Sequence, residues 1–147
     1  MFVLIVGAGR VGSAIARNML AQGHDVSVLD EDPEAIALLE RGLERPWEDI
    51  GGQFTVGTAL EMDALVAAGI ENADAFVAAT DGDNTNLVIA QIAKRRFDIE
   101  KVVVRVLDPM RAQWYEDQGL LTVCPTQKAI EMLQEAVGVS GSSQELV

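Results

Sequence analysis

Met1-Phe-Val-Leu-Ile-Val-Gly-Ala-Gly-Arg-Val-Gly12 is the stretch that decides the fold. The apolar run from Phe2 to Val6 predicts a strand that is buried on both faces. The glycines that follow it have the spacing G-x-G-x-x-G, which is typical of a tight turn from a strand into a helix that binds phosphate. We expect that helix over Arg10–Ala21, with its N-terminal N–H groups and the positive end of its dipole facing an anion.

Each glycine has its own role in such a turn. Gly7 permits the tight turn, Gly9 lets a phosphate approach the bare backbone, and Gly12 lets the helix pack close to the strand. Many glycine-containing turns hold no ligand, so the pattern alone is weak evidence. Asp30 adds to it, because it ends the next expected strand 18 residues beyond Gly12, where the dinucleotide fingerprint places an acid for the ribose hydroxyls.

Composition excludes several classes of function. The 147 residues suffice for one domain, and 23 acids against 11 bases give a net charge of −12, which disfavours nucleic acid and anionic membranes as partners. A single cysteine, Cys124, and a single histidine, His24, leave no internal disulfide and no zinc constellation. No apolar run approaches the roughly 18 residues of a membrane span, so we expect a cytoplasmic protein without direct membrane insertion.

Apolar runs and helical patterns alternate along the chain. Strands are expected at Phe2–Val6, Asp25–Leu29, Phe54–Val56, Ala75–Ala79, Val102–Val106 and Leu120–Val123. Helices are expected at Arg10–Ala21, Pro33–Arg41, Glu61–Ala68, Thr85–Arg96, Pro109–Asp117 and Thr126–Val137, the last capped by Thr126. This alternation predicts an α/β fold, a doubly wound Rossmann fold with a six-stranded parallel sheet in the order 3-2-1-4-5-6 and helices on both faces.

The predicted fold sets the domain boundaries. Residues 1–138 are expected to form one nucleotide-binding domain, and the Ser- and Gly-containing stretch 139–147 a flexible tail. The loop Leu43–Gly52 is longer than a compact unit needs, and it is either a local elaboration or a contact surface.

Ligands of this fold sit beyond the carboxyl ends of the strands, where the strand order reverses. The candidate ligand-binding residues all fall at those ends or in the turns that follow. They are Gly7, Ala8, Gly9, Arg10, Val11, Gly12, Asp30, Glu31, Gly57, Thr58, Ala59, Ala79, Thr80, Asp81, Asn86 and Arg105. The glycine turn and Asp30 recognise parts that NAD(H), ATP, ADP and AMP share, whereas the acids beside Asp30 would repel the 2′-phosphate of NADP.

Other polar residues near these turns have structural alternatives. Arg10 stands at a helix start, where a cation is unfavourable unless an anion binds there, but it could also be merely exposed. Asp83 or Asn84 could cap the helix that follows. Arg105 ends a strand among apolar neighbours, and we expect it to pair with an acid such as Asp108 or with a neighbouring subunit.

Five stretches resemble the RCK or TrkA-N domain family, the regulatory nucleotide-binding module of potassium channels and potassium uptake systems. They are Val6-Gly-Ala-Gly-Arg-Val-Gly12, Val28-Leu-Asp30, Ala68-Gly-Ile-Glu-Asn-Ala-Asp-Ala75, Ala78-Ala-Thr-Asp-Gly-Asp-Asn-Thr-Asn86 and Val104-Arg-Val-Leu-Asp-Pro109. The Ala-Gly-Ile run and the Thr…Asp-x-x-Asn turn are more specific than the glycine fingerprint. The resemblance is greatest to the regulatory subunits of bacterial potassium uptake systems.

The resemblance implies a regulatory subunit that forms dimers or rings of dimers and attaches to a membrane-embedded potassium transporter or channel subunit at the inner face of the membrane. It also implies that Arg10 reaches the terminal phosphates of a nucleotide. Two features depart from the family. Gly57-Thr58 stands where the family usually has Gly-Asp, and the chain ends where members commonly continue into a ligand-binding subdomain, so we expect a truncated or stand-alone domain.

Two other functions are compatible with the fold: a small NAD-dependent oxidoreductase, or a nucleotide sensor unrelated to ion transport. An oxidoreductase needs an acid or base beside the nicotinamide, commonly His or Lys. His24 is expected at the opposite end of the sheet and the lysines lie elsewhere, so we expect no enzyme activity, no catalytic residue and no metal site.

The last expected helix carries an apolar stripe formed by Ile130, Leu133 and Val137. Trp114 and Tyr115 add apolar area on the helix before it. Because the sheet already has helices on both faces, this stripe is expected to pack against a second copy of the chain.

Overall fold

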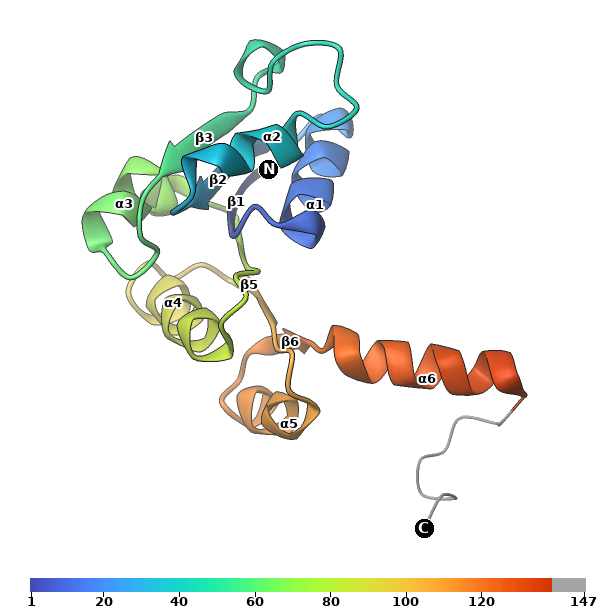
Figure 1. Ribbon diagram of the computed structural model, residues 1–147. Coiled ribbons are helices and arrows are strands. Elements are labelled where there is room, and N and C mark those ends of the chain that lie inside the picture. The colour runs from blue at the N-terminus through green and yellow to red at the C-terminus, as the bar shows by residue number, and fades with distance from the viewer. Residues whose placement is uncertain (139–147) are drawn as a thin grey trace.

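A six-stranded parallel sheet organises residues 1–138, which are the residues that the computed structural model describes; the predicted tail 139–147 lies outside them (Figure 1). Its strands are β1 (Phe2–Val6), β2 (Asp25–Asp30), β3 (Gln53–Val56), β4 (Ala75–Ala78), β5 (Lys101–Arg105) and β6 (Leu121–Val123). The order β3-β2-β1-β4-β5-β6 confirms the predicted Rossmann topology. β2 and β3 lie on one side of β1, and β4, β5 and β6 lie on the other, so the strand order reverses between β1 and β4. In this topology a ligand binds at the carboxyl ends of the strands, next to the reversal.

Within the described residues five α-helices connect these strands and a sixth follows β6, and every helix boundary except the start of α2 lies within two residues of the predicted one. They are α1 (Arg10–Ala21), α2 (Ile36–Leu39), α3 (Met62–Ala67), α4 (Asp83–Arg95), α5 (Pro109–Asp117) and α6 (Pro125–Val137). None of them is long and apolar enough to cross a membrane. The helix predicted over Pro33–Arg41 is shorter, because its first turn is the 3-10 turn η1 (Pro33–Ala35), which the Asp32 carboxylate caps by accepting from the Glu34 N–H (2.9 Å).

The cap predicted for α6 is wrong, and neither of the two residues considered as a cap for α4 is its cap. Gly82 is the N-cap of α4, with no side-chain cap, and neither Asp83 nor Asn84 fills that role. The Asp83 carboxylate instead accepts from the N–H groups of Leu107 (2.8 Å) and Asp108 (3.1 Å), which ties the start of α4 to the loop after β5. In α6 the N-cap is the residue before Pro125, because proline with its fixed φ begins the helix one residue before the predicted cap.

The hydrophobic core has two parts, one on each face of the sheet. Leu4 and Val6 of β1 pack with residues of α3, α4 and α5, whereas Val3 and Ile5 pack with residues of α1 and α2. Alternate residues of β1 thus serve opposite faces, which accounts for its uninterrupted apolar sequence.

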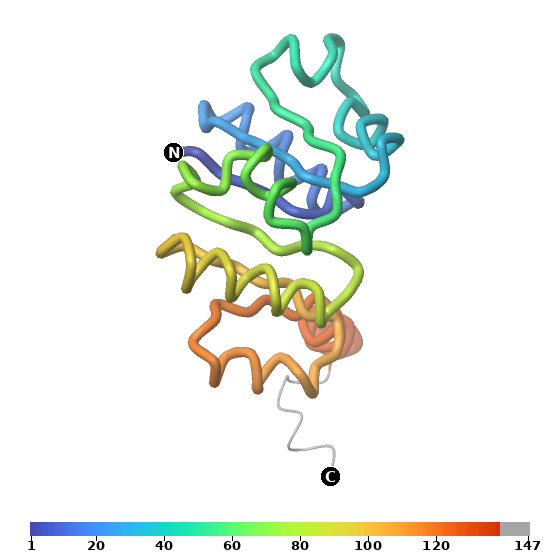
Figure 2. Tube along the Cα trace, turned by 90° about the vertical axis from the view of Figure 1, so that its left-hand side faces the viewer, coloured from blue at the N-terminus to red at the C-terminus, as the bar shows by residue number. Residues whose placement is uncertain are grey.

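Trp47 makes the loop Leu43–Gly52 part of the core on the α1 and α2 side. Its side chain is fully buried, its N–H donates to the Glu40 carboxylate (2.7 Å), and its indole Nε1 donates to the Gln53 carbonyl (3.1 Å). The loop extends beyond the ends of α2 and β3 in both orientations of the molecule (Figures 1 and 2). Its tryptophan therefore anchors it, and the rest of the loop stays on the surface.

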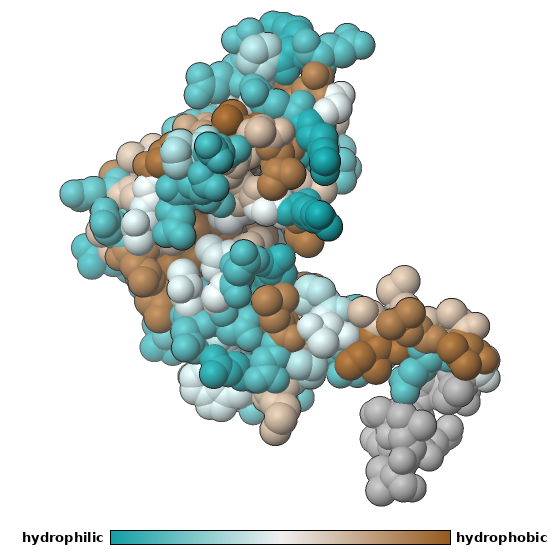
Figure 3. Space-filling model, viewed as in Figure 1, coloured by the Kyte–Doolittle hydropathy of each residue, from teal (hydrophilic) through white to brown (hydrophobic). Residues whose placement is uncertain are grey.

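Helix α6 projects away from the sheet, with no buried residue (Figure 1). Leu133 is 68% exposed, and apolar side chains run along the helix in the space-filling view (Figure 3). Leu121 and Val123 of the neighbouring edge strand β6 are 65% and 46% exposed. This end of the sheet therefore lacks the cover that α1 and α2 give to β1, β2 and β3.

Tyr115 does not contribute to that exposed surface, contrary to the prediction. Its side chain is buried against α4, and its hydroxyl donates to the Asp83 carbonyl (2.6 Å). Burial, together with the nearby Asp83 carboxylate, raises the pKa of the Tyr115 hydroxyl, so it stays protonated and can donate this bond. Trp114 is half exposed, as predicted.

Candidate functional site

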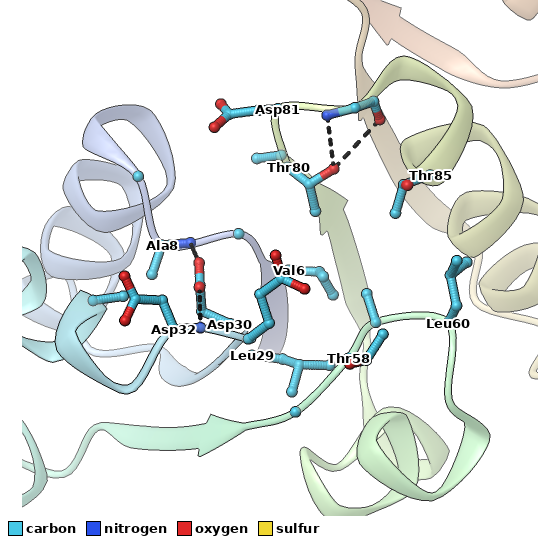
Figure 4. Close-up of a pocket in the computed structure, with 18 of the residues that line it drawn as sticks. Val6, Ala8, Leu29, Asp30, Asp32, Thr58, Leu60, Thr80, Asp81 and Thr85 are labelled. Carbon is cyan, nitrogen blue, oxygen red and sulfur yellow. Dashed lines mark hydrogen bonds between the residues drawn. The ribbon is translucent and has the colours of Figure 1, made fainter.

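A crevice of about 660 Å³ opens at the carboxyl ends of the first four strands, where the strand order reverses (Figure 4). Most of the predicted ligand-binding residues line it: Gly7, Ala8, Gly9, Asp30, Glu31, Gly57, Thr58, Ala59, Ala79, Thr80 and Asp81. They come from turns that are far apart in sequence. The parallel strand order brings them together.

The glycine turn fits its place between β1 and β4 because two of its residues carry no Cβ. Gly7 has a φ of +105°, and a Cβ there would lie 2.5 Å from the Ala79 carbonyl oxygen. A Cβ on Gly12 would lie 1.8 Å from the Gly7 carbonyl oxygen. A Cβ on Gly9 would meet no atom within 4 Å, so this part of the backbone is open to a ligand. The start of α1 beyond it carries no acid in its first turn, which suits an anion.

Asp30 links the glycine turn to the loop after β2. One of its carboxylate oxygens accepts from the Ala8 N–H (2.7 Å) and the other from the Asp32 N–H (2.9 Å), as Figure 4 shows. Each carboxylate oxygen can accept more than one hydrogen bond, so both keep capacity for ribose hydroxyls. The structure thus places Asp30 where the fingerprint requires it and fixes its orientation.

The side of the crevice next to Asp30 is acidic. Glu31, Asp32 and Glu34 line it, together with the apolar side chains of Ala35 and Leu38. Arg10 is exposed at the start of α1 and does not line the crevice. A phosphate attached to a ribose at Asp30 would meet three acids here, and the helix N-terminus is a better place for one.

Asn86 determines the shape of the opposite side. It is fully buried, and its amide oxygen accepts from the Thr80 N–H (3.0 Å) and hydroxyl (2.6 Å). Its amide nitrogen donates to the carbonyl oxygens of Thr80 (3.0 Å) and Arg105 (2.9 Å). Asn86 therefore holds Thr80 in the crevice wall without lining the crevice itself.

Arg105 supports the same wall from β5. Its guanidinium donates to the carbonyl oxygens of Ala79 (3.0 Å) and Thr80 (2.7 Å) and pairs with the carboxylate of Asp81 (3.3 Å). The expected pairing with an acid is thus confirmed, but the acid is Asp81 and not Asp108, which caps α5 and lies beside Arg111 (3.8 Å). Arg105 is thus a brace behind the crevice rather than part of its lining.

The lining of the crevice differs from the predicted set of ligand-binding residues at its margins. Arg10, Val11, Gly12, Asn86 and Arg105 do not line the crevice. The prediction missed lining residues that adjoin the predicted ones in sequence or lie on α2 and the 3-10 turn before it; they are Val6, Leu29, Asp32, Glu34, Ala35, Leu38, Leu60, Gly82 and Thr85. The helical spacing of Ala35 and Leu38 was the available signal, because residues three apart share a helix face. His24 lies 3.2 Å from the N-terminal amine, at the opposite end of β1 from the crevice, as predicted.

Residues 3–125 match the TrkA-N domain. The chain belongs to the TrkA-N family. This match spans the glycine turn, Asp30 and the Thr80–Asn86 loop, so the geometry described above is that of a TrkA-N domain.

Curated relatives extend the likeness over nearly the whole chain. The Trk system potassium uptake protein TrkA of Streptomyces coelicolor is 37% identical over 142 residues, which are 97% of this chain and 60% of the relative. The protein of the same name from Mycobacterium tuberculosis is 30% identical over 144 residues, which are 95% of this chain and 60% of the relative. The chain thus spans about 60% of the length of these TrkA relatives.

Solved structures share the fold and include nucleotide complexes. The Kef C-terminal domain of Shewanella denitrificans in its AMP-bound form has a TM-score of 0.76 at 28% identity, covering 99% of this chain and 86% of that one. GsuK bound to ADP has a TM-score of 0.75 at 18% identity, covering 93% of this chain and 34% of that one. GsuK bound to NAD has a TM-score of 0.65 at 16% identity, covering 88% and 22%. The GsuK structures show likeness of fold alone.

Proposed function

We propose that residues 1–138 form a regulatory nucleotide-binding domain that controls potassium transport through a membrane-embedded transporter or channel subunit. The observation that carries the proposal is the crevice of a TrkA-N domain, with an open glycine turn and, hydrogen-bonded to it, the Asp30 carboxylate in the crevice lining. The TrkA relatives support the role in potassium transport. The proposed ligand is NAD(H) or an adenine nucleotide (ATP, ADP or AMP), which the AMP complex of the Kef domain supports.

In this proposal each part of the ligand has its own side of the crevice. The ribose hydroxyls bind Asp30, the phosphates lie over the backbone from Gly9 to Gly12, and the base contacts the apolar side chains of Ala35 and Leu38. NADP is disfavoured, because its 2′-phosphate would face the acids beside Asp30.

The lining favours ligand sensing over hydride transfer. Among the described residues that line the crevice, the ionisable ones are Asp30, Glu31, Asp32, Glu34 and Asp81, without a histidine or lysine. The first four of these lie beside the expected ribose, so they are not placed to act on a substrate at the nicotinamide. We propose that the domain is not an enzyme. A ligand would then regulate by binding one arrangement of the assembled domains more tightly than another.

The proposal predicts selective stabilisation by nucleotides. NADH, NAD, ATP, ADP, AMP and NADP are compared by thermal shift, and a ligand at 100 times its Kd stabilises the fold by about 2.7 kcal/mol. Asp30→Ala is expected to weaken the best ligand by at least about tenfold, because a charge-assisted hydrogen bond to ribose is lost.

Asp63→Ala is the matched control, because Asp63 is an exposed acid on α3 outside the crevice. Its ligand affinity, measured by titration calorimetry, is expected to match that of the unmodified protein. Equal affinity for Asp30→Ala and Asp63→Ala would remove Asp30 from the site. Tighter binding of NADP than of NAD would contradict the argument from the acids.

We also propose that the domain works as a homo-oligomer, a dimer or a ring of dimers, in the cytoplasm at the inner face of the membrane. The exposed stripe of α6 and the exposed side chains of β6 support a two-fold interface that buries both. Such an interface would bury the apolar side chains of α6 and β6 that the helices of each copy leave exposed.

Leu133→Asp is expected to weaken the dimer by at least about tenfold, because a large apolar side chain would be replaced by a charge in the interface. Lys128→Asp introduces an aspartate on the opposite side of the same helix, where Lys128 is exposed, and is expected to leave the dimer intact. Sedimentation or light scattering measures both. A monomer at tens of micromolar in the unmodified protein would refute the interface.

A further inference from the structure

A second hollow, a groove of about 390 Å³, is lined by residues of β3, of α2 with the turn before it and of the loop before β3, and it shares no lining residue with the crevice. Its apolar part is formed by Pro33, Ile36, Pro46, Phe54 and Val56, and Val56 is 51% exposed. Glu40 lies beside α2, and Glu48 and Asp49 lie in the loop anchored by Trp47. We name these lining residues together the β3 groove.

The backbone of β3 is available along this groove. β3 is an edge strand with β2 as its neighbour, and the Gly57 N–H points toward β2 because it donates to the Asp30 carbonyl (3.0 Å). Backbone groups alternate in direction along a strand, so those of Phe54 and Val56 point away from the sheet. An extended segment lying in the groove could therefore pair with β3 as an added strand.

The charge of the groove selects the kind of segment that fits it. Glu40 uses one carboxylate oxygen for the Trp47 N–H and has capacity for further donors. Glu48 and Asp49 are exposed. Arg45, which donates to the Asp49 carbonyl (3.1 Å), offsets part of this charge, so two negative charges remain at the rim.

We propose that the β3 groove binds an extended segment of a partner protein that carries lysine or arginine side chains alternating with aliphatic ones. The aliphatic side chains would cover Phe54 and Val56, and the cations would meet the rim acids. A second copy of β3 would bring the same acids face to face, and an anionic membrane surface would be repelled. Because cytoplasmic loops of membrane proteins are rich in lysine and arginine, this inference rests on the proposed function and gives a docking place for its membrane partner.

The test uses a fluorescein-labelled octapeptide in which lysine and arginine alternate with leucine and valine, titrated with the protein in fluorescence anisotropy at physiological salt. Glu48→Lys combined with Asp49→Lys is expected to weaken binding by at least about tenfold. Glu116→Lys combined with Asp117→Lys makes the same change of net charge on exposed acids of α5 and is expected to change it by less than about twofold. A peptide with serine in place of leucine and valine, and one with methylated backbone nitrogens, are both expected to bind much more weakly.

Equal weakening by the two double variants would show non-specific attraction to an acidic protein and overturn the inference. The inference would also be overturned if the serine peptide or the methylated peptide bound as tightly as the original peptide. Binding of anionic vesicles in place of the peptide would overturn it as well. A shift of oligomeric state in the Glu48 and Asp49 variant would reassign the groove to a contact between copies. Nucleotide stabilisation is measured on the same samples, so a failure of the groove is distinguishable from a failure of the proposed function.

Discussion

Asn86→Asp is expected to lower the free energy of unfolding by about 3–5 kcal/mol and to weaken nucleotide binding. The amide nitrogen of Asn86 donates to two carbonyl oxygens, those of Thr80 and Arg105, in a fully buried position. An aspartate cannot donate these bonds when ionised, and it would place a negative charge against both oxygens. The loop that carries Thr80 into the crevice would then lose the side chain that holds it.

Asn84→Asp is the matched control for this change. Asn84 is exposed at the start of the same helix, and its amide oxygen accepts a bond from Arg111 (2.6 Å) that an aspartate can also accept. Its effect on stability is expected to stay below about 1 kcal/mol. Urea unfolding of both variants, followed by circular dichroism, measures the difference. An Asn86→Asp variant as stable as the Asn84→Asp variant would contradict the role assigned to the buried amide.

The sheet order and the position of the crevice could be predicted because they follow from local patterns. The apolar run of β1 and the glycine turn after it define the first strand and helix, and Asp30 follows at the expected distance. Six strands in alternation with helices allow few topologies, and the parallel order then fixes which turns meet. Residues in those turns, such as Thr58 and Thr80, line the crevice for that reason.

The contacts behind the crevice could not be predicted in the same way, because they join segments far apart in sequence. Asp83 stands where a helix cap would stand, but its carboxylate binds N–H groups 24 and 25 residues farther along the chain. Those groups lie in the loop after β5, where no strand partner is available to them. A local pattern contains no information about these distant N–H groups, so the sequence indicated a possible cap and not this contact.

Asn86 and Arg105 show a second reason why the sequence alone could not give the site: it does not distinguish a residue that contacts the ligand from one that supports the crevice wall. Polar residues near the expected ligand were interpreted as contacts, whereas the structure places both behind the wall, where they bind backbone carbonyl oxygens. Residue type and position along the sequence were the same for either role. Only burial distinguishes the two roles, and burial depends on how α4 packs on β4 and β5.

Trp47 is a residue whose structural role the sequence did not indicate. The loop around it carried no periodic pattern, so its role stayed open in the sequence, yet its indole fills the core under β2 and β3. The exposure of the α6 stripe was predicted correctly, because Ile130, Leu133 and Val137 lie on a helix that the sheet of the same chain does not cover. What covers that stripe stays a prediction.

Gly12→Ala is expected to abolish nucleotide binding and to lower the free energy of unfolding by about 3 kcal/mol or more. The added methyl group would lie 1.8 Å from the carbonyl oxygen of Gly7 and 3.0 Å from its carbonyl carbon. Both atoms belong to the backbone of the turn, so no side-chain rotation relieves the overlap. Helix α1 would have to move away from β1, which would open the turn over which we propose that the phosphates lie. The helix propensity gained from alanine, about 1 kcal/mol, is too small to compensate.

Gly9→Ala separates the effect on the fold from the effect on the ligand. Gly9 has a φ of −72°, which any residue can adopt, and its added methyl group would meet no protein atom within 4 Å. Its stability without ligand is therefore expected to change by less than about 0.5 kcal/mol. Because the methyl group would project into the space that we propose for the phosphates, the affinity for AMP or NADH, measured by calorimetry, is expected to fall. A Gly12→Ala variant that melts at the temperature of the unmodified protein would show that the turn can relax, and the close packing of α1 on β1 would then not depend on this glycine.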